Sequence, residues 1–400
     1  MADMAREKYL SLYIGNHGKQ DGIEDYITLI TKLLAKRDVR VKASSAYDPH
    51  AVNLVIDEFT NYVENHRIAA FKKAHPKTPI VLVLTEFAVR KWGVESFNHF
   101  GGPFNAAAIA LFDVYLRLVR DDFGKVGVGS VVRLLCYSPL LALQMLIDAL
   151  RFFFGMLVRR RVPHRSIKFL QTYHQTIYFH MRYLGLKACL RYADAIVTSH
   201  ESVIDGFARE SGAHGQPLQF FGVLYPELEE RVVIDKLMVG KKLFMEITGS
   251  ITRYRQSWIE RINRQLTALG LHNVFGYCAS LPFSLVASSK PFERGAYSLH
   301  PPQTRTWPYS SPTRIFRALS VDHNLPVLTR HFRQNPIEDV CFVLENKMSI
   351  VELYEMYGDR VRLTQFIEPR LKSYNEIVVA RNDALVERLR GLIDSQGLAG

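Results

Sequence analysis

The residues best suited to chemistry lie at 310–314, where Ser-Ser-Pro-Thr-Arg precedes an apolar stretch. Proline is favoured in the first turn of a helix, because its missing amide donor is not needed there. Ser310 and Ser311 occupy positions where hydroxyls usually cap a helix. The amides and the positive dipole end of such a helix suit a phosphate. We therefore predict an anion-binding helix start that includes Thr313 and Arg314, with an ordinary capped helix as the alternative.

A second basic turn follows an apolar strand segment earlier in the same half of the chain. Gly249 and Ser250 make this turn, and Arg253 and Arg255 come shortly after it. Two guanidinium groups at a strand-to-helix turn can hold a diphosphate through charge-assisted hydrogen bonds. A solvated basic turn is the alternative. We predict that this turn and the helix start at 310–314 converge on one diphosphate.

Two further residues are candidates for acid–base chemistry. Glu86 follows the apolar strand predicted at 79–84. In open parallel sheets, ligands bind beyond the carboxyl ends of the strands, where a carboxylate can act as a general base. Glu86 could equally cap a helix or form a salt bridge. His17 lies in the glycine-rich loop 15–22 and is the second candidate; this loop lacks both the dinucleotide fingerprint and the P-loop lysine pattern.

The elements that must position these residues alternate between strands and helices. Apolar runs predict strands at 9–14, 40–45, 79–84, 195–198, 243–248 and 326–329. Helical periodicity predicts helices at 23–35, 202–212, 258–269, 315–321 and 367–398. The proline-rich stretch 288–309 is predicted to be a loop. This alternation predicts an α/β fold with parallel sheets.

A chain of 400 residues exceeds what one hydrophobic core usually organises, so we predict two α/β domains. The first is placed at 1–225 and contains a membrane-associating insertion at about 128–165. The second is placed at 226–375, and a final helix at 376–400 is expected to pack back towards the first domain. Hydrophobic residues make up 48% and charged residues 22% of the chain, which excludes a disordered protein.

The net charge of +12 lies mostly in the first half, because residues 1–200 hold 27 Lys and Arg against 17 Asp and Glu. An uneven basic surface indicates an anionic partner, either a membrane or a nucleic acid. The sequence has no RNA-binding aromatic signature, zinc finger or basic-zipper pattern, so we expect no nucleic-acid partner. The membrane is therefore the favoured partner.

The segment 128–165 carries the membrane prediction. Its apolar run between Arg133 and Asp148 is shorter than the ~20 residues that a spanning helix needs. Amphipathic helices in the headgroup region fit better, with an arginine cluster on anionic lipid. A buried helix that ends in a basic turn and a true span remain alternatives. The predicted membrane-binding residues are Phe152, Phe153, Phe154, Arg159, Arg160, Arg161 and Arg165.

The cysteines give no sign of a metal site or a disulfide framework. Cys136, Cys189, Cys278 and Cys341 are far apart and form no Cys-x-x-Cys pair, which fits a reducing compartment. The first residues contain no long apolar run before a cleavage site, so no secretory signal is expected. We expect no metal and no cofactor.

The order of the motifs resembles the GT-B glycosyltransferase superfamily. Four stretches carry the resemblance: GNHGKQDGIEDYITLITKLL at 15–34, RYADAIVTSHESVIDGF at 191–207, TGSITRYRQSWIERI at 248–262 and SSPTRIFRALSVDHNLPVLT at 310–329. The resemblance implies two Rossmann-like domains that face each other across a cleft. It also implies that a nucleotide sugar binds mainly to the second domain and an acceptor mainly to the first.

The implied activity is transfer of a sugar from a UDP- or GDP-linked donor to a hydroxyl of a lipid-linked or polysaccharide acceptor, by a peripheral enzyme on the cytoplasmic face of the membrane. The absence of any Asp-x-Asp motif suits a metal-independent enzyme. One departure from the family is Arg317, which stands where a donor-binding glutamate is usual, so the ribose contact is left open. A GT-B-fold sugar-nucleotide epimerase and a non-catalytic membrane adaptor are the alternatives.

Overall fold

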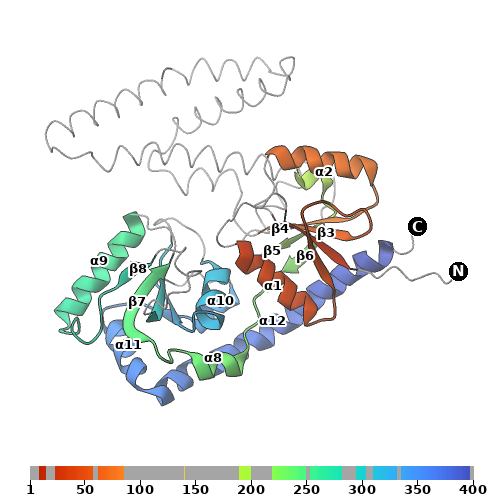
Figure 1. Ribbon diagram of the computed structural model, residues 1–400. Coiled ribbons are helices and arrows are strands. Elements are labelled where there is room, and N and C mark those ends of the chain that lie inside the picture. Colours follow the sequence, from red (N-terminus) through yellow and green to blue (C-terminus); the bar gives the residue numbers. More distant parts are fainter. Residues whose placement is uncertain are drawn as a thin grey trace. The chain divides into compact units, whose positions relative to one another are not determined.

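The computed structural model describes residues 9–14, 23–56, 62–84, 139, 189–199, 219–248, 253–281, 294–302, 310–330 and 335–396. The chain divides into two compact units, one of which comprises Met1–Phe59, Ile68–Glu86 and Arg191–Gly400. This unit contains both of the sheets described below (Figure 1). Among the described helices, none is both long enough and apolar enough to cross a bilayer.

The first sheet has six parallel strands in the order β2-β1-β3-β4-β5-β6. The strands are β1 (Leu10–Tyr13), β2 (Val41–Ser44), β3 (Val52–Ile56), β4 (Ile80–Leu84), β5 (Ala195–Thr198) and β6 (Gln219–Val223). Helix α1 (Ile23–Ala35) connects β1 to β2, and α2 (Tyr62–Ala74) connects β3 to β4. Every residue of β1, β3, β4 and β5 is buried, as is typical of parallel strands covered on both faces.

The second sheet has five parallel strands in the order β11-β10-β9-β7-β8. The strands are β7 (Lys242–Thr248), β8 (Ala279–Leu281), β9 (Gly295–His300), β10 (Leu325–Leu328) and β11 (Phe342–Val343). The helices that accompany them are α8 (Glu230–Lys236), α9 (Arg253–Ala268), α10 (Pro312–Ser320), η5 (Pro336–Val340), α11 (Met348–Gly358) and α12 (Arg360–Gln396). The predicted α/β class with two Rossmann-like parallel sheets is therefore confirmed.

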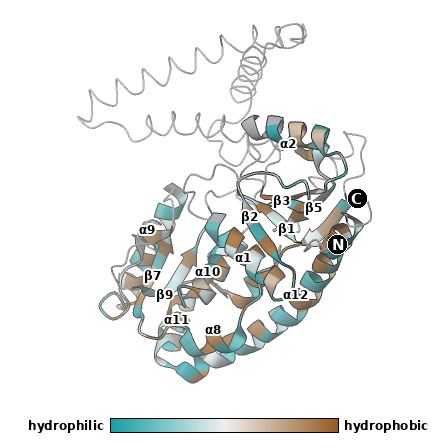
Figure 2. Ribbon diagram, turned by 45° about the vertical axis from the view of Figure 1, so that its right-hand side comes forward, coloured by the Kyte–Doolittle hydropathy of each residue, from teal (hydrophilic) through white to brown (hydrophobic). Residues whose placement is uncertain are grey.

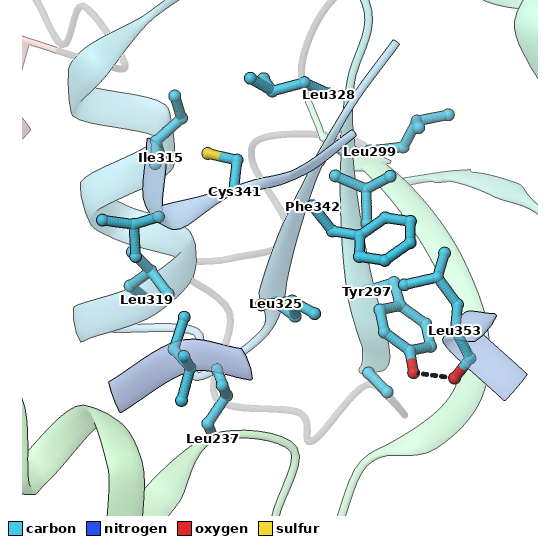
Figure 3. Close-up of a cluster of buried hydrophobic side chains, with 14 of the residues drawn as sticks. Leu237, Tyr297, Leu299, Ile315, Leu319, Leu325, Leu328, Cys341, Phe342 and Leu353 are labelled. Carbon is cyan, nitrogen blue, oxygen red and sulfur yellow. Dashed lines mark hydrogen bonds between the residues drawn. The ribbon is translucent and has the colours of Figure 1, made fainter. Parts of the chain in front are cut away.

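The core of the second sheet fixes the position of α10 against β9 and β10. Ile315 and Leu319 lie one helical turn apart on the buried face of α10, as expected of an amphipathic helix. Figure 3 shows Ile315 beside Cys341, with Leu319, Leu325 and Tyr297 in the same cluster. The hydroxyl of the buried Tyr297 donates to the backbone carbonyl of Leu353, so this tyrosine is satisfied within the core.

Helix α12 connects elements of both sheets, because it packs against η5 and α8 and also against β6. Asn382 accepts a hydrogen bond from the Tyr225 amide at 3.2 Å and donates to its carbonyl at 2.9 Å. Arg388 donates to the carbonyl of Phe221 at 2.5 Å. Figure 2 shows hydrophilic residues along much of this helix, interrupted by hydrophobic ones. The helix is continuous through the predicted boundary at 375/376.

Several predicted elements agree with the structure, including α1 and β5 with their predicted bounds. The loop predicted at 288–309 was wrong, because it contains β9, a central strand of the second sheet. A Cβ at Gly295 would lie 2.6 Å from the carbonyl oxygen of Phe244, so this glycine serves close strand packing and is not a turn signal. Helix α9 begins at Arg253, earlier than predicted, and α12 begins at Arg360. The helix predicted at 202–212 lies outside the described residues.

Candidate anion-binding site

The site lies at the carboxyl ends of the strands of the second sheet. Parallel strands end at the same edge, and helices α9 and α10 begin beyond β7 and β9. Ser311 is the residue before α10 and has an extended backbone, with φ −97° and ψ 106°. Its hydroxyl makes no capping hydrogen bond to the amides of the first turn. The amide end of α10 is therefore not occupied by its own cap.

The two predicted capping hydroxyls have other partners. The Ser310 hydroxyl donates to Oε1 of Glu338 at 2.8 Å, and both residues are buried. Ser311 Oγ lies 3.3 Å from Thr313 Oγ1. The expected capping role of both serines is thus wrong, because a buried carboxylate needs a hydrogen-bond donor and takes the one from Ser310. Both serines still stand at the start of α10.

Arg255 of α9 enters the same edge of the sheet. Only 4% of this residue is exposed, and its Nε donates to the carbonyl of Pro301 at 3.2 Å. Burial and the nearby charge of Arg314 lower the pKa of Arg255 to about 9, so it is still protonated at neutral pH. Arg255 and Arg314, which belong to separate motifs, are therefore close enough for their charges to interact.

His300, the last residue of β9, belongs to this cluster and was missed in the sequence. The residue is partly buried, but its Nε2 atom is enclosed and has no hydrogen-bond partner. Burial, together with the charges of Arg314 and Arg255, lowers the pKa of His300 to about 3. The imidazole is therefore neutral beside two guanidinium groups. A histidine in a segment predicted to be a loop gave no signal of this role.

Thr329 follows β10, directly beyond the position at which Leu328 pairs with His300. Only 7% of Thr329 is exposed, and its hydroxyl has no hydrogen-bond partner. Buried polar atoms without a partner are rare and cost about 1–3 kcal/mol each. Two such atoms at the ends of neighbouring strands, together with the charges of Arg255 and Arg314 that act on His300, favour an anionic ligand with several hydrogen-bond acceptors at this edge.

Arg317, one turn further along α10, has carboxylate partners. Its Nη1 donates to both carboxylate oxygens of Asp25 in α1 at 3.2 Å, and its Nε lies 3.5 Å from Asp322. Arg294 extends this network, with Nη2 at 2.5 Å from Asp322 and Nη1 at 3.6 Å from the buried Glu246. Burial raises the pKa of both Asp25 and Glu246. Arg317 thus pairs with the acids Asp25 and Asp322.

The remaining predicted site residues are not placed. Only the backbone of Arg253 is described, as the first residue of α9. Within the described ranges, no group of three His, Cys, Asp or Glu side chains could hold a metal ion. The predicted residues outside the described part of the chain are Glu86, His17, Gly249, Ser250, Phe152, Phe153, Phe154, Arg159, Arg160, Arg161 and Arg165.

Comparison with known proteins gives only structural likenesses, since no protein-family model and no curated protein matches the chain. The chain is similar to an α,α-trehalose 6-phosphate synthase from Burkholderia multivorans, with 10% identity, 96% of this chain and 79% of that chain covered, and a TM-score of 0.39. It is similar to a UDP-forming α,α-trehalose-phosphate synthase from Burkholderia xenovorans, with 11% identity, coverage of 92% and 80%, and a TM-score of 0.37. A UDP-glucosyltransferase from Polygonum tinctorium has 12% identity, coverage of 94% and 83%, and a TM-score of 0.26. Likenesses of this size do not place the chain in a family.

Proposed function

We propose that the protein is a glycosyltransferase of the GT-B type that moves a sugar from a UDP- or GDP-linked donor to a hydroxyl of a lipid-linked or polysaccharide acceptor. One observation carries the proposal. The charges of Arg255 and Arg314 act on each other and on His300, and His300 and Thr329 have partnerless atoms at the ends of neighbouring strands near the start of α10. This set of donors suits a diphosphate.

In the proposed reaction, the acceptor hydroxyl attacks the anomeric carbon and the nucleoside diphosphate leaves. Negative charge develops on the departing diphosphate, and donors that are already in place stabilise it more than they stabilise the bound substrate. Arg255, Arg314 and the amides of α10 supply this stabilisation without a metal ion. We assign deprotonation of the acceptor to Glu86, or else to His17, on their sequence positions.

The proposed place of action is the cytoplasmic face of a membrane, with the protein bound peripherally to anionic lipid. The support for this part is the apolar and arginine-rich sequence at 128–165. Such a location would bring the enzyme to a lipid-linked acceptor.

Nucleotide binding tests the donor site directly. Thermal shift with UDP, GDP and their sugar conjugates should find one base that stabilises the fold, by about 2.7 kcal/mol at a hundredfold excess over its dissociation constant. Arg314→Ala should weaken that binding by roughly 1.5–3 kcal/mol, the usual contribution of a charged hydrogen bond. Arg264→Ala is a matched control, because this arginine lies on α9 and is exposed.

The outcomes separate the proposal from its alternatives. A membrane adaptor would bind no nucleotide, and an epimerase would convert the sugar nucleotide without any acceptor. Undiminished binding of every nucleotide sugar by the Arg314→Ala protein would rule out the assigned donor site. Release of nucleoside diphosphate that depends on an added glycan or lipid-linked acceptor is the result that we expect for a transferase.

A further inference from the structure

His300 stands out among the described residues of the candidate anion site, because an imidazole can change its charge near neutral pH once its surroundings change. Its Nε2 is enclosed and without a partner at the end of β9. Arg255 reaches this point from α9 and is bonded to Pro301, the neighbour of His300. Arg314 lies in the first turn of α10, and its charge acts on His300. Two cations therefore act on one neutral imidazole at this end of the sheet.

The charge of the expected ligand changes during the reaction. The diphosphate of a nucleotide sugar carries about two negative charges, and the released nucleoside diphosphate carries about three at neutral pH, because the second pKa of a terminal phosphate is about 6. Two guanidinium groups match the donor. They leave one charge of the product unmatched.

Resting on the proposed function, we propose that His300 takes up a proton as the diphosphate leaves, so that the site matches the charge of the product and of the late transition state. His300 would then act as a catalytic residue that contacts the phosphate which carries the breaking bond. The structure assigns it this position through the partnerless Nε2 atom, the end of β9 and the two arginines around it.

The step balances in atoms and charge. The acceptor oxygen forms a bond to the anomeric carbon, and the bond from that carbon to the phosphate oxygen breaks with its electron pair on the phosphate. The acceptor proton leaves to the base of the first domain. The base returns the acceptor proton to the solvent, and His300 takes up one proton from the solvent. The imidazolium keeps this proton and donates it in a hydrogen bond to the phosphate.

The surroundings of His300 explain why the proton arrives only with the ligand. Among the described residues, the groups that act on the pKa of His300 are Arg314 of α10 and Arg255 of α9, and both lower it. The side chain beyond the neighbouring strand β10 is Thr329, which does not titrate. A bound sugar nucleotide offsets the two guanidinium charges and leaves the partly buried ring neutral. The extra charge of the product then favours the imidazolium form.

Isothermal titration calorimetry in buffers of different ionisation enthalpy measures how many protons the protein takes up when a ligand binds. At about pH 7.5, His300 is neutral in the free protein. Binding of UDP to the full-length protein should then take up close to one proton. Binding of UDP-glucose should take up almost none. GDP and GDP-mannose serve as the second matched pair. Above the pKa of His300 in the free protein and below its pKa in the complex, the dissociation constant of the diphosphate should rise by up to about tenfold per pH unit.

Two variants separate the proton from the contact. His300→Asn should abolish proton uptake and the steep pH dependence of diphosphate binding, while it changes binding of the sugar nucleotide much less. Thr329→Val should weaken both ligands similarly and keep the proton uptake, because a hydroxyl carries no titrating charge. Thermal melts establish that each variant is folded. The comparison of UDP with UDP-glucose uses wild type alone and does not depend on any variant.

The failures are distinguishable. If neither nucleotide pair binds, the proposed function itself is wrong. If both members of a pair bind with the same proton uptake, or if His300→Asn leaves the uptake of wild type intact, the donor site stands and the role of His300 is overturned.

Discussion

At the scale of single residues, the candidate anion site contains groups whose burial destabilises the folded protein when no ligand is bound. Arg255 is buried near the charge of Arg314, and His300 is forced to be neutral beside both. Burial of like charges and of polar atoms without partners is costly, and such clusters occur at functional sites. The arginines could be predicted because basic residues follow strand segments in the sequence. His300 and Thr329 could not, because their importance depends on which strands are neighbours.

The pH dependence of stability follows from His300. Its pKa is about 3 in the folded protein against an ordinary 6.5. Below pH 6.5 the unfolded chain takes up this proton and the folded protein does not, so the free energy of unfolding should fall as the pH drops, by up to about 1.4 kcal/mol per pH unit. His300→Asn removes this contribution. Urea unfolding of both proteins between about pH 7 and 5 tests it, and parallel curves would contradict the assignment.

The assigned base can be tested by one isosteric change. Glu86→Gln keeps the shape of the side chain and removes its basicity, so turnover should fall by about 10²–10⁴-fold while donor binding persists. Steady-state rates and calorimetry on the same preparation measure the two effects. Unchanged turnover would move the role to His17, for which His17→Gln is the corresponding variant.

At the scale of elements, close packing explains both what the sequence predicts and what it hides. Helix α1 and strand β5 have the bounds that their apolar patterns predict, because each buries a regular face. Strand β9 was hidden, because Gly295, Ser298 and His300 interrupt its apolar pattern and prolines surround it. Gly295 allows close packing against Phe244, and His300 belongs to the candidate anion site. A local sequence pattern reveals neither role.

Gly295 gives a direct test of this packing. A Cβ at this position would lie 2.6 Å from Phe244 O and 3.1 Å from its ring, so Gly295→Ala should destabilise the protein by about 1–3 kcal/mol through overpacking. Gly391→Ala is the matched control, because this helical glycine has no atom within 4 Å of the added Cβ. The control should be stabilising by up to about 1 kcal/mol. Chemical denaturation compares the two, and equal shifts would mean that strand packing does not set the effect.

At the scale of the whole molecule, the amino-acid sequence was enough to predict two parallel α/β sheets, because 400 residues with alternating strand and helix patterns allow few other solutions. The domain boundaries stay predictions. Helix α12 shows why a local sequence pattern cannot define the domain boundaries, since one continuous helix packs against η5 of the second sheet and β6 of the first.

Membrane binding is the prediction that belongs to this scale. Wild type should float with anionic liposomes, because each basic residue near the leaflet contributes about 1 kcal/mol and buried phenylalanines add about 25 cal/mol per Å². Changing Arg159, Arg160 and Arg161 to Glu should leave weaker binding that does not depend on lipid charge. Changing Phe152, Phe153 and Phe154 to Ser should make binding sensitive to salt.

A charge-matched control is available on the described surface. The exposed residues Lys236, Lys347 and Lys372 can be changed to Glu with the same change in net charge. This control should still float if the segment 128–165 is the contact. Wild type that remains in the soluble fraction with anionic lipid at low salt would show that the membrane assignment is wrong.

The contact between α12 and β6 also bears on self-association. Strand β6 is the edge of the first sheet, and an uncovered edge strand offers unpaired backbone groups to other chains. Arg388 occupies the Phe221 carbonyl, and Leu385 lies 3.6 Å from the position of a Cβ on Gly222. The C-terminal part of α12 therefore hinders edge-to-edge pairing, and loosening it would expose β6 to other chains and promote aggregation.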